Sequence, residues 1–406
     1  MARIVQKFGG TSVADLERIR HVADTVKRAH DAGDEVAVVV SAMAGTTDQL
    51  EAWAIEASHE HGKKEHDVVL SAGEQISAGL LAIALQGLGV EARSFMGWQI
   101  AVRTDDAHTK ARILEIDTND LDPYLKAGHV AVVPGFQGLA PGGRISTLGR
   151  GGSDTSAVAL AAALHADRCD IYTDVDGVYT CDPRIVAKAR KLDKITYEEM
   201  LEMASLGAKV LQTRSVSMAM RHNVRLHVRS SFDATEGTLV VGEDEILEQS
   251  VVSGIAYNRD EAKIVLVGVP DRPGVAAAIF GPLAAANINV DMIVQNVSDD
   301  GKSTDLTFTV AKGELDAAVK ALEARRSELK FSDVRSDADV VKVSVIGVGM
   351  RSHAGVAGQM FATLAEKGIN IQVISTSEIK VSVLIAEEYT ELALRALHTA
   401  YGLDAD

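Results

Sequence analysis

The chain of 406 residues carries a formal net charge of −16, with 47% hydrophobic and 24% charged residues. This balance is typical of an ordered globular protein with two to four domains and argues against intrinsic disorder. The acidic charge, without a long Lys/Arg run, argues against a nucleic-acid partner, because such a partner needs a positive face. The two cysteines, Cys169 and Cys181, indicate neither a disulfide framework nor a metal cluster.

The N-terminal residues read directly as a strand and lack the apolar core of a signal peptide. No stretch approaches the roughly 20 continuous apolar residues that are needed to cross a bilayer. We therefore expect a cytoplasmic protein that has no membrane partner.

Short apolar runs alternate with helical patterns before residue 230, which favours an α/β domain with a largely parallel sheet. The predicted strands are Ile4–Phe8, Val36–Ser41, Val90–Phe95, Val130–Pro134, Cys169–Thr173 and Arg225–Val228. The predicted helices cover residues 13–31, 73–87, 153–165 and 207–221. Residues at helical spacing in the second of these helices are Ile76, Leu80, Ile83, Ala84 and Gly87.

An internal repeat follows a polar, acid-rich segment at 232–250, where we place a domain boundary. The two copies, residues 263–293 and 342–374, each run strand, turn, Gly-Val, helix, Ile-Asn and strand. Further strands are predicted at Asp305–Val310 and Val381–Ala386. The apolar residues that recur along the two helices are Val275, Ile279 and Leu283, and then Val356, Met360 and Leu364. Two copies of a small α+β module fit this pattern better than a solenoid does.

Polar, glycine-rich turns follow the predicted strands, where ligands bind in open α/β sheets. The first turn, residues 7–12, joins Lys7 to two glycines whose amides could approach a phosphate, although a plain turn with a surface lysine fits as well. The second, residues 41–48, offers hydroxyl groups for a compact polar ligand, or is an ordinary polar loop.

The third turn, residues 149–156, leads into an Ala-rich helix. Arg150 supplies a planar fork that matches a carboxylate or a phosphate. Asp154 is either part of a site or only a helix cap. A fourth segment, residues 172–184, could hold an adenine ring and ribose or be a structured connection. Neither a Walker A motif nor a G-x-G-x-x-G after the first strand occurs, which excludes a P-loop NTPase and a plain dinucleotide-binding domain by motif.

Together these segments resemble the amino-acid kinase family and, within it, the aspartate kinases. The motifs that carry the resemblance are KFGGTS at 7–12, SAMAGTTD at 41–48, GE at 73–74, GRGGSDTSA at 149–157, TDVDGVYTCDPR at 173–184 and GAKVL at 207–211. The resemblance continues through both repeats. It implies a three-layer αβα sandwich of the amino-acid-kinase type, with a mainly parallel sheet, followed by two α+β ferredoxin-like ACT domains.

The activity that the resemblance implies is that of an ATP:L-aspartate 4-phosphotransferase, which makes 4-phospho-L-aspartate. This is the first step of lysine, threonine and methionine biosynthesis, with diaminopimelate on the same route. ATP would be the co-substrate, and Mg²⁺ would be bound mainly through the ATP phosphates, with no residue assigned as a metal ligand. The implied domains are a catalytic domain at 1–232, a linker with a strand at 233–262, and ACT domains at 263–335 and 340–406.

The resemblance also implies roles for single residues in catalysis. Lys7, Asp154 and Arg150 would be catalytic: Lys7 steadies the moving phosphoryl group, and Asp154 organises that lysine. Glu74 would pair with the α-ammonium of aspartate and Arg150 with its α-carboxylate. The whole aspartate site would consist of Ser41, Thr47, Glu74 and Arg150. The nucleotide would be held by Lys7, Gly9, Gly10, Ser12, Thr173, Asp174, Tyr179, Arg184, Lys209 and Val210.

ACT domains in this family bind end-product amino acids, usually lysine or threonine, between chains, so a homodimer or a higher oligomer is implied. The matching positions of the first module are Asp271, Gly274, Ala276, Asn289, Asp291 and Gln295. Those of the second are Val356, Ala357, Asn370, Ile371, Ser377 and Glu378. Asp271 would bind an effector's ammonium group, or would merely shape the turn. The first module is typically inserted into the second, to which the strand at Val251–Ala256 would then belong.

The chain departs from the family pattern at two places. Gln212-Thr213 stands where the more familiar motif has His-Pro, as in some monofunctional forms. The second module has Met350 to Gly355 where the first has Asp271 to Gly274, so an acid is missing there and the two modules need not bind one ligand alike. Nothing follows the second module, and we expect no fused homoserine dehydrogenase.

Two alternatives stay open at this point. One is a sister kinase that acts on acetylglutamate, glutamate, carbamate or UMP, although Glu74 favours a substrate with a free ammonium group over acetylglutamate and UMP. The other is a non-catalytic amino-acid sensor, against which intact Lys7, Arg150 and Asp154 argue.

Overall fold

A computed structural model describes residues 2–207, 210–246, 250–297 and 303–404. The chain divides into two compact units. The first consists of Met1–Val178, Lys191–Ala204 and Lys209–Glu248, and the second of Tyr179–Arg190, Ser205–Ala208 and Gln249–Asp406. The polypeptide therefore passes into the second unit and back before it enters it for the last time.

An eight-stranded sheet forms the centre of the first unit, in the order β10-β12-β11-β9-β1-β2-β6-β3. All neighbouring strands are parallel except β11 and β12. The strands are β1 (Arg3–Phe8), β2 (Glu35–Val40), β3 (Ala92–Ser94), β6 (Val130–Pro134), β9 (Arg168–Thr173), β10 (Lys194–Thr196), β11 (Leu226–Ser230) and β12 (Thr238–Val241). A smaller sheet contains β4 (Arg103–Thr104), β5 (Ile113–Glu115), β7 (Gln137–Ala140) and β8 (Arg144–Thr147), in the order β5-β4-β7-β8.

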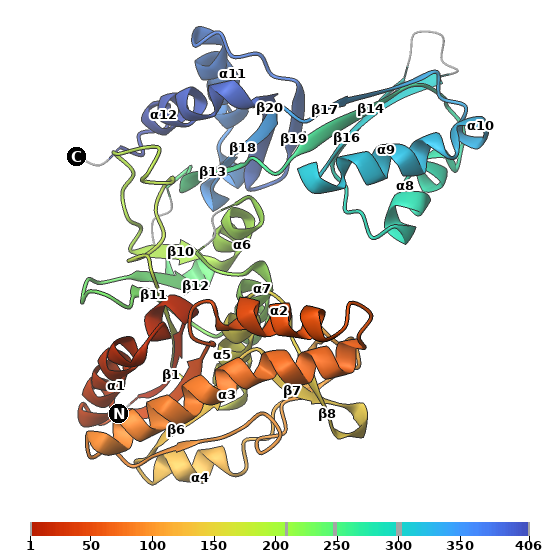
Figure 1. Cartoon of the computed structure of the whole chain (residues 1–406). Coiled ribbons are helices and arrows are strands. Elements are labelled where there is room, and N and C mark those ends of the chain that lie inside the picture. The colour runs from red at the N-terminus through yellow and green to blue at the C-terminus, as the bar shows by residue number, and fades with distance from the viewer. Residues whose placement is uncertain (1, 208–209, 247–249, 298–302, 405–406) are drawn as a thin grey trace. The chain divides into compact units, whose positions relative to one another are not determined.

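Helices cover both faces of the large sheet, so the unit has three layers (Figure 1). On one face, α1 (Leu16–Asp31) and α3 (Lys63–Gly87) pack together over a core that includes Ile4 and Phe8. Because side chains alternate along a strand, Val5 and Lys7 point to the other face, where α5 (Gly152–Ala163) lies against β1. The other helices are α2 (Thr46–Ala57), α4 (Leu121–Lys126), α6 (Tyr197–Ser205) and α7 (Thr213–His222).

Helix α3 is the one helix in the described part of the chain that is long and apolar enough to cross a membrane. Half of its most apolar window is buried inside the protein, which is the pattern of a core helix. Its inward face carries the buried carboxyl groups of Asp67 and Glu74. The apolar spacing that predicted this helix marks its outer side, because Ile76 and Ile83 are 53% and 65% exposed.

The six predicted strands of this unit are confirmed, with ends that differ by one or two residues. Three predictions for this unit need correction. The helix predicted at 73–87 begins ten residues earlier, at Lys63. The helix predicted at 207–221 begins only at Thr213, and α6 ends before it. The segment at 41–48 is not all loop, since α2 begins at Thr46 after Gly45, whose φ of +77° favours glycine.

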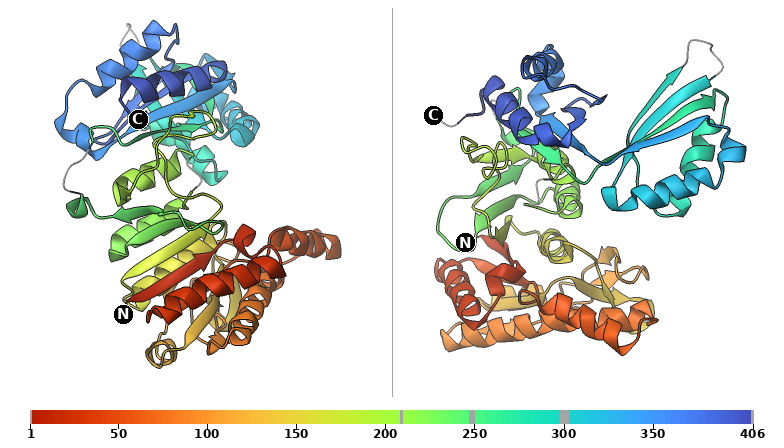
Figure 2. Two further views of the ribbon diagram at one scale, coloured as in Figure 1. Left: turned by 90° about the vertical axis from the view of Figure 1, so that its left-hand side faces the viewer. Right: turned by 45° about the horizontal axis from the view of Figure 1, so that its top comes forward.

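The second unit contains two antiparallel four-stranded sheets, each with its own helices (Figure 2). The first module has β14 (Ala262–Pro270), β15 (Asp291–Val297), β16 (Ser303–Val310) and β17 (Asp333–Asp337), with α8 (Val275–Ala285), α9 (Leu315–Glu323) and α10 (Arg326–Leu329). The second has β13 (Gly254–Asn258), β18 (Val340–Ile346), β19 (Val373–Thr376) and β20 (Lys380–Ala386), with α11 (Val356–Glu366) and α12 (Thr390–Ala400).

The repeat has the structure that its spacing predicts. The six recurring apolar residues of α8 and α11 are all buried in the cores of their modules. Strand β13 precedes the first module in sequence but pairs with β18 of the second. The first module is therefore an insertion within the second.

Residues 179–190 belong to the second module rather than to the large sheet. Cys181, Val186 and Ala189 share its hydrophobic core. The Thr180 carbonyl accepts a hydrogen bond from the backbone of Ile255, and its hydroxyl lies 2.9 Å from Nε2 of His398 on α12. This part of the predicted nucleotide segment is thus built into the second module.

Candidate active site

A cavity of about 330 Å³ lies at the carboxyl ends of β1 and β2 in the first unit. Five segments far apart in sequence line it: the end of β1 with the turn that follows, the segment after β2, the middle of α3, Phe136 after β6, and the loop before α5 with its first turn. The predicted site residues among its lining are Lys7, Gly10, Ser41, Thr47, Glu74, Arg150 and Asp154. The structure therefore brings together the predicted aspartate site and the predicted catalytic residues.

Lys7 and Asp154 form an ion pair at the base of the cavity. The distance from Lys7 Nζ to Asp154 Oδ1 is 2.6 Å, and each side chain is 11% exposed. A charge buried to this degree needs a partner of opposite charge, and here the lysine and the aspartate neutralise each other. Asp154 lies in the first turn of α5, where the helix dipole favours a negative charge. This pair holds an ammonium group at a fixed position beside the cavity.

The glycines of the first turn let two backbone segments approach closely. A Cβ atom on Gly10 would lie 3.0 Å from the carbonyl oxygen of Ala42, and one on Gly9 would lie 3.4 Å from Lys7 Nζ. The Ser12 hydroxyl donates to Ser231 Oγ at 3.0 Å. Gly9, Gly10 and Ser12 are all predicted to hold the nucleotide, but only Gly10 lines the cavity.

Glu74 presents a buried carboxyl group to the cavity. Its side chain comes from α3, and Oε1 accepts a hydrogen bond of 3.1 Å from the Ala42 amide. Oε2 has no hydrogen-bond partner among the described residues. Burial raises the pKa of Glu74 to about 7. The hydrogen bond from the Ala42 amide lowers this pKa, but the effect of burial is larger. A cationic ligand would satisfy the unpaired oxygen and restore the charge.

Arg150 differs from these groups because it is exposed and has no ion pair or hydrogen bond within the described ranges. It stands between Gly149 and Gly151, whose φ angles of +77° and +70° lie in the left-handed region. A Cβ on Gly151 would lie 1.9 Å from Cγ of Gln212, one of the two residues that depart from the family motif. Ser41 and Thr47 line the cavity as half-buried hydroxyl groups.

The predicted nucleotide residues belong to both units. Thr173 and Asp174 follow β9 in the first unit, and the Thr173 hydroxyl donates to Asp174 at 3.1 Å. Tyr179 and Arg184 belong to the second unit, and Arg184 donates to Asp182. Val210 is half-buried. Lys209 lies outside the described residues.

The predicted effector residues of the first module, Asp271, Gly274, Ala276, Asn289, Asp291 and Gln295, are all exposed. One of them has a partner that the sequence did not indicate: Asp291 pairs at 2.7 Å with Lys342 of the second module, which also pairs with Glu261. In the second module, Val356 is buried in the core and Ala357 and Ile371 are half-buried, while the exposed positions are Asn370, Ser377 and Glu378.

Other lining residues were not singled out from the sequence. Asp48 and Phe136 both line the cavity. Asp48 closes the 41–48 motif and could have been found there, whereas Phe136 follows β6 without a recognisable signal. No group of three or more His, Cys, Asp or Glu side chains that could hold a metal ion occurs within the described ranges.

A family model described as "Amino acid kinase family" matches residues 2–230, and ACT domain models match residues 263–327 and 343–401. Together with the parallel sheet and the cavity at its strand ends, these matches define the class: an amino acid kinase that carries two ACT domains.

Full-length relatives narrow this class. The chain is 59% identical over 408 residues to the aspartate kinase of Pseudomonas fluorescens, a match that covers 100% of this chain and 98% of that protein. Among solved structures it resembles E. coli aspartokinase III in complex with aspartate and ADP, with a TM-score of 0.80, 30% identity and coverage of 98% and 99%. The same enzyme in complex with lysine and aspartate gives a TM-score of 0.79, with 30% identity and 98% coverage of both chains. The chain belongs to the amino acid kinase family, among its aspartate kinases.

Proposed function

We propose that the cavity binds L-aspartate between Glu74 and Arg150 and that Lys7 guides the γ-phosphoryl group of ATP onto the substrate's side-chain carboxylate, giving 4-phospho-L-aspartate. The observation that carries this proposal is the unpaired, buried Oε2 atom of Glu74, in one cavity with Arg150 and with the Lys7–Asp154 pair. A free α-ammonium group is the natural partner of that oxygen. Acetylglutamate and UMP have no such group. The full-length aspartate kinase relatives support the same substrate.

The chemistry needs no general base. A carboxyl side chain with a pKa near ~3.9 is already ionised at neutral pH. The difficulty is that one anion must approach another, so catalysis rests on alignment and on compensation of the charge that spreads over the moving group. Asp154 accordingly serves to hold Lys7 rather than to accept a proton.

The residues around the cavity divide this work. Arg150 would bind the α-carboxylate by a two-pronged contact, and Glu74 the α-ammonium group. Ser41 and Thr47 would add neutral hydrogen bonds, and the backbone at Gly10 would approach the phosphates. Lys7 would stabilise the transferred group. Gly9, Ser12, Thr173, Asp174, Tyr179, Arg184, Lys209 and Val210 would serve the nucleotide.

Magnesium would supply further positive charge at the phosphates. The cavity offers three carboxyl groups: Asp154 is already paired with Lys7, Glu74 is assigned to the ammonium group of the substrate, and Asp48 is exposed. This set fits an ion that is held mainly by the ATP phosphates and water, with few protein ligands.

The regulatory part of the proposal concerns the two modules. Lysine, threonine or both would bind at the residues assigned above, between chains of a homodimer or a larger oligomer. All six first-module residues are exposed, which leaves them accessible to a second chain. The domain limits given from the sequence belong to this proposal, as does a place in the cytoplasm, where ATP and L-aspartate are both available.

One assay tests the function. ADP release is measured by a coupled reaction with ATP and Mg²⁺, with and without L-aspartate, and hydroxylamine traps the acyl phosphate. Aspartate-dependent turnover with trapped product supports the proposal. Turnover with acetylglutamate, glutamate, carbamate or UMP instead would indicate a sister enzyme, and no turnover with any substrate would indicate a sensor.

A further inference from the structure

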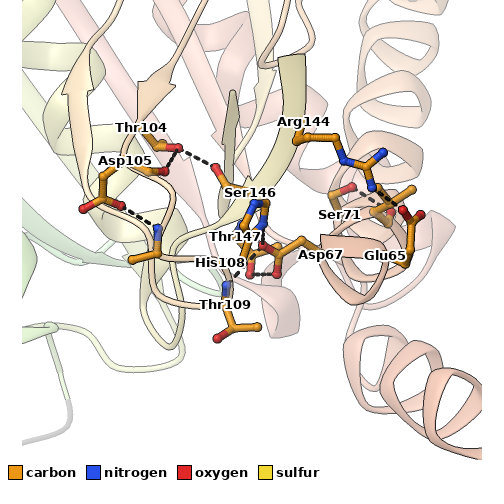
Figure 3. A network of polar contacts seen from close by, with 12 residues as sticks. Glu65, Asp67, Ser71, Thr104, Asp105, His108, Thr109, Arg144, Ser146 and Thr147 are labelled. Carbon is orange, nitrogen blue, oxygen red and sulfur yellow. Dashed lines mark hydrogen bonds and ion pairs between the residues drawn. The ribbon is translucent and has the colours of Figure 1, made fainter. Parts of the chain in front are cut away.

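A buried carboxylate outside the cavity binds an unusual number of donors. Asp67 on α3 is fully buried, and Figure 3 shows the polar network around it. Its Oδ2 atom accepts from His108 Nδ1 at 2.7 Å, from the Thr109 amide at 3.1 Å and from the Thr147 amide at 3.0 Å. Its Oδ1 atom accepts from the Thr147 hydroxyl at 2.7 Å. Four donors from two distant segments thus converge on one side chain.

Asp67 connects the helix and the strand that carry the two proposed substrate-binding residues. Asp67 precedes Glu74 by seven residues, which is close to two helical turns, so both lie on the inward face of α3. Thr147 is the last residue of β8 and precedes Arg150 by three residues. The network therefore joins the helix that presents Glu74 to the loop that presents Arg150.

The loop before Arg150 is held mainly through its backbone. The Thr147 carbonyl accepts from the Ala111 amide at 2.9 Å, and the Leu148 carbonyl accepts from Arg214 at 2.9 Å. A Cβ atom on Gly149 would lie only 3.1 Å from the carbonyl oxygen of Thr109. The amide of the same Thr109 donates to Asp67. Because no ion pair or hydrogen bond fixes the Arg150 side chain within the described ranges, its location depends on this backbone.

Other bonds join the same helix to the neighbouring strand. Gln137 of β7 donates to the Ser71 carbonyl at 3.1 Å and accepts from Gln75 at the same distance. These bonds hold α3 against β7 but do not touch the residues that lead to Arg150. Asp67 thus joins α3 directly to the end of β8, while an ion pair between Glu65 and Arg144 joins α3 to the start of that strand.

We propose that Asp67 is a positioning residue for substrate binding: through Thr147 and Thr109 it sets the spacing between Glu74 and Arg150, and so the fit of an amino acid of aspartate's length. This inference rests on the proposed function. Two binding groups gain from alignment only if both are held in place, and a small misplacement can cost a large part of the binding. The Lys7–Asp154 pair lies outside the network and should keep its geometry.

Two substitutions weaken the tie to different degrees. Asp67→Asn keeps the size of the side chain but leaves at least one of the four donors without an acceptor. Thr147→Val removes only the hydroxyl bond to Oδ1. Ser146→Ala is the matched control, because Ser146 is the adjacent buried residue of β8, points to the other side of the strand and pairs with Thr104 at 2.6 Å.

The measurement is the KM for L-aspartate and for ATP, with kcat and the melting temperature, on the full-length enzyme. We expect Asp67→Asn to raise the aspartate KM roughly tenfold or more, and Thr147→Val about threefold, with the ATP KM and the kcat at saturating aspartate within about twofold. Ser146→Ala should lower the melting temperature without a change in the aspartate KM.

Three outcomes overturn the inference: an unchanged aspartate KM in both variants, an equal rise in the Ser146→Ala control, or a loss of kcat with both KM values unaltered. If Asp67→Asn does not fold, Thr147→Val decides by the same criteria. A parent enzyme without aspartate-dependent turnover would refute the proposed function, whereas an active parent with an insensitive Asp67→Asn variant refutes only the positioning role.

Discussion

The catalytic cavity and the first regulatory module both carry charged candidate residues, but most of these residues are buried in the cavity, whereas those of the module are exposed. In the cavity, Lys7, Glu74 and Asp154 are buried, and the lysine and the aspartate pair with each other. In the first module, Asp271 is exposed to water. A buried charge without a partner is costly, so Glu74 indicates a missing ligand, while an exposed acid indicates nothing by itself. The cavity can therefore be assigned from a single chain, and the effector site cannot.

The largest effect should come from Lys7. Lys7→Ala removes the positive charge closest to the proposed phosphoryl transfer, and we expect kcat to fall by roughly 10²–10³ with little change in the aspartate KM. Steady-state kinetics with a melting curve measure this, since Asp154 also loses its partner. Lys27→Ala is the control, because Lys27 pairs with Asp31 on the outer side of α1. A near-normal kcat in Lys7→Ala would exclude the role.

Arg150 should act on binding instead. Arg150→Ala removes a two-pronged contact to the α-carboxylate, and hydrogen bonds to charged groups contribute about 1.5–3 kcal/mol each. We expect the aspartate KM to rise roughly 100-fold or more, with kcat at saturation reduced far less than in Lys7→Ala. An aspartate saturation curve equal to that of the parent enzyme would mean that the substrate lies elsewhere.

The pKa of Glu74 gives the cavity a pH dependence. Burial raises this pKa to about 7, so below pH 7 the free enzyme carries a neutral Glu74 that cannot pair with an ammonium group. We expect the aspartate KM to rise up to about tenfold per pH unit as the pH falls below 7. The ATP KM serves as the internal control. An aspartate KM that stays flat between pH 8 and pH 6 would contradict the assignment.

The same burial should lower stability at high pH. Because the folded pKa of Glu74 exceeds the ordinary value of 4.5, the folded state keeps a proton that the unfolded state releases, and stability falls as the pH rises from 4.5 to 7. At pH 8, Glu74→Gln should therefore raise the free energy of unfolding of the ligand-free enzyme by roughly 1–3 kcal/mol. It should also abolish tight aspartate binding. Urea titrations at pH 8 and pH 5 measure this, and an equal effect at both values would contradict it.

The smallest effect on basal activity should come from Asp271, the exposed acid of the first module. Asp271→Ala should raise the concentration of lysine or threonine needed for inhibition by about fivefold or more, the lower end of typical coupling between sites, with unchanged turnover in the absence of effector. Asp316→Ala, an exposed acid on α9 of the same module, is the control. Undiminished inhibition in Asp271→Ala would indicate that this acid only shapes the turn.

Much of the fold could be predicted because the strands are continuous apolar runs and the repeat keeps its helical spacing. Helix α2 was missed because its first residues, Thr46 and Thr47, read as a polar loop. The buried face of α3 was not identified, since Ile76 and Ile83 lie on its outer side while Glu74 lies on the inner one. Periodicity locates a helix, but tertiary packing decides which side is covered.

Most residues that line the cavity could be predicted because each of their segments follows a strand or matches a motif. The contacts among distant residues could not. Asp67 lies 41 residues from His108 and 80 from Thr147, and Lys342 lies 51 from Asp291. No spacing rule relates such positions. The predicted nucleotide residues are divided between the two units, because the chain passes into the second unit after Val178.

The most direct measurement is a crystal structure with L-aspartate and a non-hydrolysable ATP analogue bound. Our account predicts the α-carboxylate on the Arg150 guanidinium, the α-ammonium group on Glu74 Oε2, and Lys7 Nζ between the substrate's side-chain carboxylate and the terminal phosphate. Aspartate bound outside this cavity, or Lys7 directed away from the terminal phosphate, would contradict it.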